Sequence, residues 1–261
     1  MRIVAAATVG PLSFCALFLA SLWGSEGIGW TETNLKSTEA LNARYGVAPG
    51  KTMRIKNLNG PINVTPASGA DVEVRAQVRY ATSDPKSIRF DVKTDEQGTR
   101  VCALWPGMDR CDSSSKDTKV EANDLVVVFD VRLPSGVLLD TVTVNGDISV
   151  RGASDAVTAA SVNGAVRVET RGAPIRATTV NGGVEVTASE LNGDGEINLA
   201  TVNGDITARL PARFDAEISA RTVSGTISVL GKDYQDRVRT TVGRGGRRLS
   251  ADAVNGSIAI R

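Results

Sequence analysis

The sequence predicts an all-β protein made of stacked repeats, a single-stranded parallel β-solenoid. Three observations indicate this fold class. A short phrase recurs every 18 to 22 residues, apolar and polar residues alternate around each copy, and no amphipathic helical pattern follows the N-terminal apolar segment. A unit of this length cannot bury its own apolar face, so it must stack on its neighbours.

The recurring phrase is Val-Asn-Gly-x-Ile/Val, and its five serial copies lie between residues 142 and 229. The Asn or Ser positions step by 18, 18, 22 and 21 residues. An outlying copy precedes them at Leu58–Val64, and a closing copy ends at Ile260. Each pair predicts a bend, because Asn and Gly tolerate turn conformations. The pairs are Asn59-Gly60, Asn145-Gly146, Asn163-Gly164, Asn181-Gly182, Asn203-Gly204, Ser224-Gly225 and Asn255-Gly256.

The positions of the apolar residues argue against a β-hairpin at each Asn-Gly, although Asn-Gly is a common hairpin turn. A two-residue hairpin loop would place Val144 beside Asp147 and mix apolar and polar residues on both faces. A chain that stays extended through the bend has one apolar face, formed by Val142, Val144, Gly146, Ile148 and Val150. We therefore expect each copy to lie over the next at the inter-strand spacing, with inward glycines and an asparagine ladder.

The N-terminal segment, residues 1–27, is predicted to be an export signal. After Met1-Arg2 there is no charged residue until Glu26, and the small residues around Ser25 suit cleavage by a signal peptidase. The apolar run is also long enough to remain as an N-terminal membrane anchor, which stays open as the alternative. Either way, we expect an exported protein of the periplasm or cell surface.

The rest of the chain is divided into a polar linker, residues 28–50, and one domain, residues 51–261. Alternating runs at Val72–Tyr80, Ile88–Val92 and Leu125–Leu133 predict further strands, separated by turn clusters.

Two cysteines, Cys102 and Cys111, remain after removal of the signal segment. In an oxidising compartment they are expected to form a disulfide that closes a short loop. A metal site is the weaker alternative, because the chain contains no histidine and no second cysteine pair.

Two other segments raise the question of a ligand site. The arginines Arg237, Arg239, Arg244, Arg247 and Arg248 form either a solvated loop or a contact with anionic envelope polymers. The segment Asn192–Glu196 approaches a calcium-binding repeat only once, so no metal site, cofactor or catalytic residue is assigned.

The charge balance and the acids limit the function classes. A net charge of +1 with 4% aromatic residues argues against nucleic-acid binding. A polysaccharide-active β-helix enzyme, a lyase or hydrolase, is the alternative to a non-enzymatic protein. The outward acids are Asp147, Glu169, Glu185 and Asp205, and Asp147 and Asp205 fall three coils apart, about 14 Å, too far for a glycosidase pair.

The chain resembles the bacterial adhesin-like β-solenoid family of exported proteins without an assigned activity. The resemblance rests on Leu133-Pro-Ser-Gly-Val137, on the serial Val-Asn-Gly phrases and on the closing Gly245 to Ile258 region, and it extends from about residue 45 to the C-terminus. It implies an extracytoplasmic, adhesin-like domain. The function that we expect is that of a non-enzymatic envelope protein, which presents ladders of side chains along a rigid rod to an envelope glycan, to another protein or to a second copy of itself.

Overall fold

The computed structural model describes residues 35–111, 123–192 and 195–261. The chain divides into two units, Met1–Glu32 and Thr33–Arg261, and every described element belongs to the second. The predicted export signal, residues 1–27, lies outside the described residues. Within the described ranges, no helix has both the length and the apolar character needed to cross a membrane.

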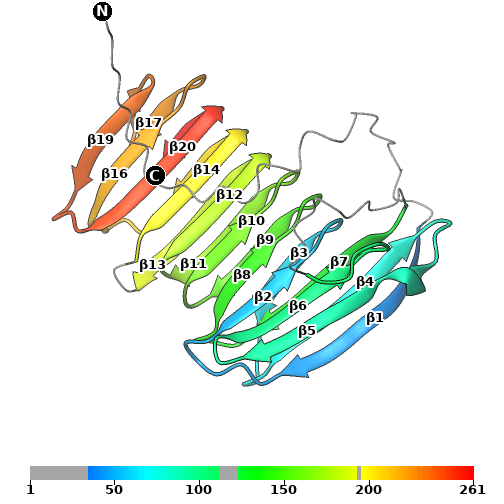
Figure 1. Ribbon diagram of the computed structural model, residues 1–261. Coiled ribbons are helices and arrows are strands. Elements are labelled where there is room, and N and C mark those ends of the chain that lie inside the picture. Colours follow the sequence, from blue (N-terminus) through cyan, green and yellow to red (C-terminus); the bar gives the residue numbers. More distant parts are fainter. Residues whose placement is uncertain (1–34, 112–122, 193–194) are drawn as a thin grey trace, which may run out of the picture. The chain divides into compact units, whose positions relative to one another are not determined.

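The strands form two sheets (Figure 1). The first sheet contains, in spatial order, β1 (Lys36–Tyr45), β4 (Val72–Tyr80), β7 (Val126–Leu133), β3 (Ile62–Pro66), β9 (Ile148–Ala153), β11 (Val166–Gly172), β13 (Val184–Asn192), β15 (Ile206–Arg209), β21 (Ile258–Ile260), β17 (Ile227–Val229) and β18 (Lys232–Tyr234). The second sheet contains β19 (Arg237–Val242), β16 (Ala216–Arg221), β20 (Arg247–Asn255), β14 (Ile197–Asn203), β12 (Ile175–Asn181), β10 (Val157–Ala160), β8 (Leu138–Val142), β2 (Thr52–Lys56), β6 (Gly98–Leu104) and β5 (Arg89–Asp95). A short 3-10 helix, η2 (Pro85–Ser87), precedes β5.

The chain passes from the second sheet to the first at each Asn-Gly bend and then returns. Thus β8 leads through Asn145-Gly146 into β9, while its partners in the sheet are β10 and β2, both parallel to it. Strands joined by the bend therefore lie in different sheets, which the hairpin interpretation does not allow. The prediction that Asn-Gly is not a hairpin turn is confirmed.

Both sheets are mixed rather than wholly parallel. The repeats pair in parallel, but β1–β4, β4–β7 and β5–β6 are antiparallel at one end, as are β16–β19 and β17–β18 at the other. The antiparallel pairs therefore lie at the two ends of the stack of parallel repeats. The prediction of an all-β fold is confirmed, whereas the expectation of parallel pairing throughout is wrong.

The segment expected to be a linker, residues 28–50, carries strand β1. This strand pairs with β4, with a register shift between Glu39 and Leu41. Its polar sequence suits an edge strand, because only one of its two sides is hydrogen-bonded to the sheet.

The spatial order of the repeats differs from their order in the sequence. The first copy lies next to the Asn145 copy, since β2 pairs with β8 and β3 with β9. The closing copy is inserted between its two predecessors: β20 pairs with both β14 and β16, and β21 with both β15 and β17.

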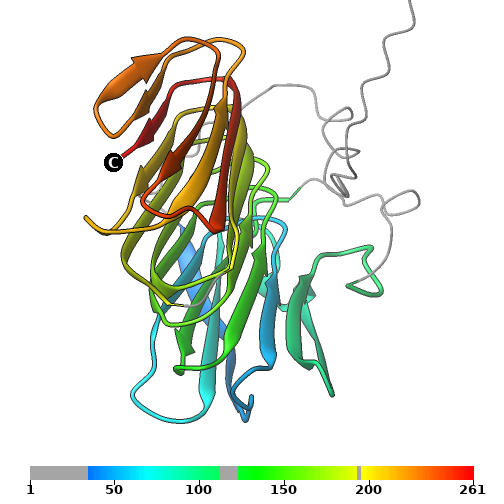
Figure 2. The same ribbon diagram turned by 90° about the vertical axis from the view of Figure 1, so that its left-hand side faces the viewer.

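The two sheets pack face to face (Figure 2). The core between them is mainly aliphatic and includes Trp105 and Phe129. After the first serial bend, Ile148 and Val150 are buried as predicted. Before the bend, Thr143 is buried and Val142 and Val144 are only partly buried. The predicted continuous apolar face is therefore wrong on the N-terminal side of the bend, because the turn between sheets reverses which alternate residues face inward.

Candidate functional site

An exposed column of asparagine side chains follows the bends. The Nδ2 of Asn163 donates to Oδ1 of Asn145 at 2.8 Å, and the same bond joins Asn181 to Asn163, Asn203 to Asn181, and Asn255 to Asn203, at 2.7, 2.7 and 2.9 Å. The ladder expected from the sequence is therefore present over these five residues. At the first copy, Asn59 donates instead to the backbone carbonyl of Leu125 at 2.7 Å.

The bend glycines are close to the neighbouring coil rather than directed into the core. A Cβ placed on Gly182 would overlap the carbonyl oxygen of Gly164, and Gly164 and Gly204 are placed in the same way against Gly146 and Gly182. Glycine is required there because the stacked backbones leave no space for a side chain.

Buried hydroxyl groups satisfy the carbonyls of these glycines. Thr179 Oγ1 donates to Gly164 O at 2.8 Å, and Thr201 Oγ1 donates to Gly182 O at the same distance. Thr143, Ser161 and Thr222 make the equivalent bonds to Gly60, Gly146 and Gly256. Strict alternation through the bend would place these hydroxyls on the face opposite Val142 and Val144, so it does not predict this role, although a Thr or Ser stands two positions before most of the Asn residues.

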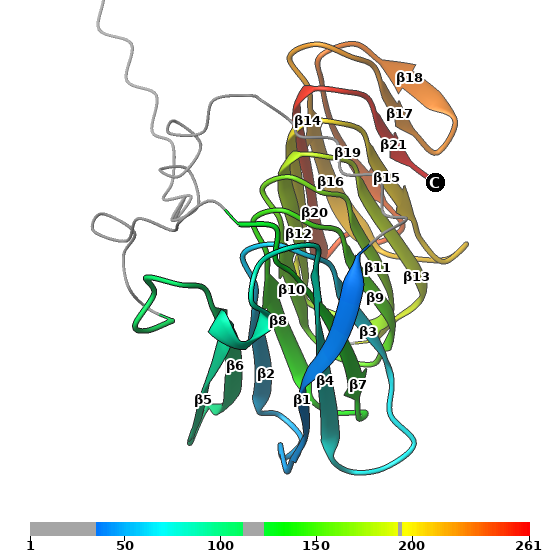
Figure 3. The same ribbon diagram turned by 90° about the vertical axis from the view of Figure 1, so that its right-hand side faces the viewer.

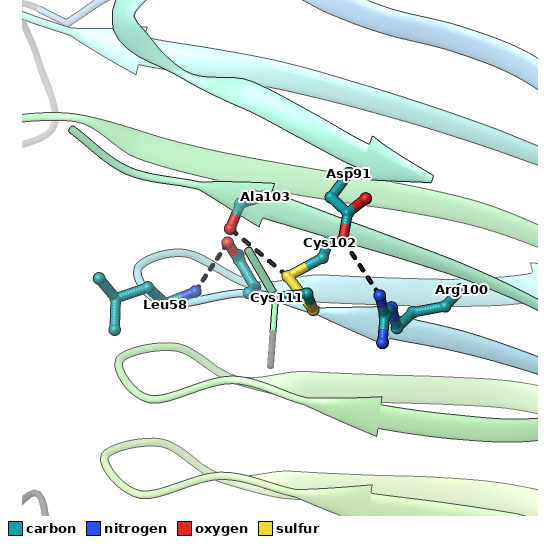
Figure 4. The surroundings of a disulfide bond; sticks show 7 residues. Leu58, Asp91, Arg100, Cys102, Ala103 and Cys111 are labelled. Atoms are coloured by element: carbon teal, nitrogen blue, oxygen red, sulfur yellow. Dashed lines mark hydrogen bonds and ion pairs between the residues drawn. A yellow bond between two sulfur atoms is a disulfide. The ribbon is translucent and has the colours of Figure 1, made fainter. Parts of the chain in front are cut away.

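The predicted disulfide between Cys102 and Cys111 is present (Figure 4), with Cα atoms 5.9 Å apart. Cys102 lies in β6, aligned with Lys56 of β2 and Asp91 of β5. The bond ties the segment after β6 to the outer face of the second sheet. Arg89 holds the same segment through a 2.7 Å bond from Nη2 to the carbonyl of Met108.

A polar depression of about 290 Å³ lies on this outer face, beside the disulfide. We call it the basic groove. It is lined by Arg54, Lys56, Lys93, Asp95, Gln97, Gly98, Arg100 and Asp140. Parallel and antiparallel register aligns Lys93 with Arg100, Arg100 with Arg54, and Arg54 with Asp140 across β5, β6, β2 and β8. The lining thus brings together four cationic side chains and two carboxylates.

The two arginines of the basic groove are held by hydrogen bonds and ion pairs. Arg54 Nη2 donates to Gln97 Oε1 at 3.4 Å, and Arg54 Nε lies 3.6 Å from Asp140 Oδ2. Arg100 Nη2 donates to Asp91 Oδ2 at 3.1 Å (Figure 4). Burial raises the pKa of the Asp140 carboxyl, while the positive charges of Arg54 and Lys56 act in the opposite direction.

A second depression, of about 360 Å³, adjoins the basic groove and shares Asp95 and Gly98 with it. Its lining contains one cation, Lys51, beside Asp95 and Glu96. The basic groove is therefore the better candidate for binding a charged ligand, because its charges converge from separate strands.

The arginines grouped in the sequence between 237 and 248 do not converge on one site. Arg244 pairs with Asp215 at 3.1 Å, and Arg248 pairs with Glu196 at 3.3 Å. Arg247 Nη2 donates to the carbonyl of Leu191 at 3.2 Å. Arg237 and Arg239 are exposed on β19.

The four outward acids considered in the sequence also occupy separate positions. Asp147 pairs with Arg167 at 3.1 Å, and Glu185 pairs with Arg209. The register places Asp147 and Asp205 three steps apart, with Ala165 and Gly183 between them. Residues 193 and 194 of the segment once considered for calcium lie outside the described residues.

Comparison with known protein families gave no match, and neither did comparison with curated proteins. Among solved structures, the chain is similar to a putative cell adhesion protein from Clostridium sporogenes, with a TM-score of 0.52 and 13% identity over 87% of this chain and 99% of that chain. A putative adhesin from Bacteroides fragilis has a TM-score of 0.32 and 12% identity over 86% of this chain and 97% of that chain. The first similarity shows a shared fold, so the resemblance to adhesin-like proteins is confirmed at the level of the fold.

Proposed function

We propose that the chain is an exported, non-catalytic adhesin-like protein, built as a two-sheet β-solenoid, whose basic groove binds an anionic envelope glycan. The observation that carries this proposal is the alignment of Lys93, Arg100 and Arg54 on neighbouring strands, with Lys56 beside them. Guanidinium groups bind carboxylate and phosphate oxygens through paired N–H donors, and lysine adds a mobile positive charge.

The fold supports binding to a polymer rather than to a small molecule. The basic groove is an open depression on a sheet face, and successive strands place its cations at a spacing of about 4.8 Å. A rigid sheet holds these charges in fixed positions, so a chain with regularly spaced anionic groups contacts several of them at once. Export is supported by the disulfide, which persists in oxidising compartments, and by the N-terminal apolar segment.

The test is binding of the purified protein to an immobilised polyuronate, compared with a neutral glucan. The parent should bind the polyuronate, and added salt should weaken that binding. The variant Lys56→Gln/Lys93→Gln should bind about tenfold more weakly, while Arg176→Gln/Arg239→Gln removes the same charge from the same sheet and should bind as the parent does. Equal loss in both variants would contradict the proposal.

The recovered polyuronate distinguishes binding from catalysis. A non-catalytic protein leaves its chain length unchanged after prolonged incubation. Shortened chains would favour the alternative, a polysaccharide-active enzyme.

A further inference from the structure

Strand β5 forms one edge of the second sheet (Figure 3). Among the described strands it pairs with β6 alone, so its other side has backbone N–H and C=O groups without a strand partner. Its side chains alternate between two environments. Phe90 packs edge-to-face on Phe129 with ring centroids 6.0 Å apart, whereas Asp91 lies on the outer face with Arg100.

When two copies of β5 are paired antiparallel, the charges of one strand are complementary to those of the other. The strand reads Arg-Phe-Asp-Val-Lys-Thr-Asp from residue 89 to residue 95. Two copies paired antiparallel and centred on Val92 would place Arg89 opposite Asp95 and Asp91 opposite Lys93. Symmetry repeats each pair, so every charged residue of the strand faces an opposite charge.

We propose that β5 pairs with β5 of a second copy of this chain, centred on Val92, and joins two second sheets into one continuous sheet. Val92 is 41% exposed, and in the pair it would lie directly against its symmetry mate. The four charged side chains of each strand share the outer face, where cross-strand neighbours interact.

The other described edge strands lack this property. Antiparallel pairing of two β1 strands about the centre of the strand brings no acid opposite a base, and the register shift near Glu39 interrupts the edge. Strand β19 carries Arg237 and Arg239 without an acidic residue, and β18 has three residues. Charge complementarity along the whole strand is therefore specific to β5 among the described edges.

The test uses a cysteine at the centre of the pair. Under mild oxidation, Val92→Cys should form a disulfide-linked dimer, because directly opposed Cβ atoms lie about 4.5 to 5.5 Å apart. The matched control, Val223→Cys, places a thiol at another exposed valine, 76% accessible, and should remain monomeric on non-reducing gels. The parent chain, which contains Cys15, shows any background from that residue.

Sedimentation equilibrium provides the second measurement. The parent should associate reversibly, and Arg89→Glu, which lies outside the lining of the basic groove, should weaken association about tenfold because two attractive pairs with Asp95 become repulsive. Lys232→Glu makes the same charge change on β18 and should have no effect. A parent that stays monomeric up to about 1 mM overturns the inference, as does crosslinking at Val223 but not at Val92.

This inference does not depend on the proposed glycan function. The crosslinking is performed without glycan, and neither Val92 nor Val223 lines the basic groove. A dimer that binds no polyuronate, and a monomer that does, are therefore distinguishable results.

Discussion

Asn181 donates from Nδ2 to the Oδ1 of Asn163 at 2.7 Å, although the two residues lie 18 positions apart. Asn181 also accepts a bond from Asn203 at 2.7 Å. Each internal asparagine of the column therefore both donates and accepts. Because these amides are exposed to water, we expect each to contribute modestly to stability, and the backbone beneath them to matter more.

The first prediction compares two adjacent glycines. Gly182→Val should lower the free energy of unfolding by about 2 to 4 kcal/mol, because its Cβ would overlap the carbonyl of Gly164. Gly183→Ala is the matched control, since the nearest atom to its Cβ is Asp205 O at 3.4 Å, an ordinary contact. Asn181→Ala should cost about 1 kcal/mol. Denaturant melts measure all three, and a Gly182→Val protein as stable as the parent would contradict the tight stacking.

The second prediction concerns the buried hydroxyls. Thr179→Val keeps the side-chain volume but removes the hydrogen bond to Gly164 O. The free energy of unfolding should therefore fall by about 1 to 2 kcal/mol. Thr178→Val changes the neighbouring residue, which is partly exposed, and should have a smaller effect. Urea denaturation measures both variants. If the two substitutions lower the free energy of unfolding equally, the hydrogen bond to the glycine carbonyl does not stabilise the fold.

The third prediction concerns the disulfide. In the chain-entropy model, replacing Cys102 and Cys111 by serine should lower stability by roughly 2.7 kcal/mol, because the bond closes a short loop. The reduced parent should show the same loss in a denaturant titration. If reduction leaves the unfolding midpoint unchanged, the bond does not constrain the unfolded chain in this way.

The fourth prediction is that glycan binding depends on pH through Asp140. Its pKa is raised by burial, so acidification from neutral pH neutralises this carboxyl before carboxyls with ordinary pKa values. The basic groove then gains positive charge, and binding of a sulfated glycan, which stays ionised, should tighten. Because the folded protein binds this proton more tightly than the unfolded chain does, the contribution of Asp140 to folding stability is present at low pH. It is lost as pH rises through the raised pKa.

Asp140→Asn provides the control for this pH effect. It should bind the sulfated glycan more tightly than the parent at neutral pH and should show a flatter pH profile. Binding isotherms over the acidic range measure both quantities. An unchanged pH profile in the variant would assign the effect to another group.

The repeat could be predicted from the sequence because its signal is local. The positions of Asn163 and Asn181, and the failure of the hairpin alternative, follow from spacing and alternation alone. The face occupied by Thr143 could not be predicted in this way, because the bend between sheets changes which alternate residues point inward. The prediction assumed that alternation continues without interruption through the bend, and it therefore placed Val142 and Val144 on the inward face.

The basic groove could not be predicted, because its residues come from separate strands. Arg54 and Gln97 lie 43 positions apart and meet at 3.4 Å only through the parallel pairing of β2 with β6. No local pattern specifies that pairing. The conspicuous run of arginines near residue 240 suggested a site instead, and its members are dispersed among separate partners.

The insertion of β20 and β21 between the two preceding coils has a consequence for the order of assembly. A polypeptide that emerges from its N-terminus can add coils one after another as far as β14 and β15. Strands β16 and β17 come next in the sequence, but their parallel neighbours are residues 247–260, which emerge later. Until residues 247–260 are added between them and the preceding coils, β16 can pair only with β19, and β17 only with β18, both antiparallel. The last two coils are thus expected to form in a single concerted step, unlike the coils before them.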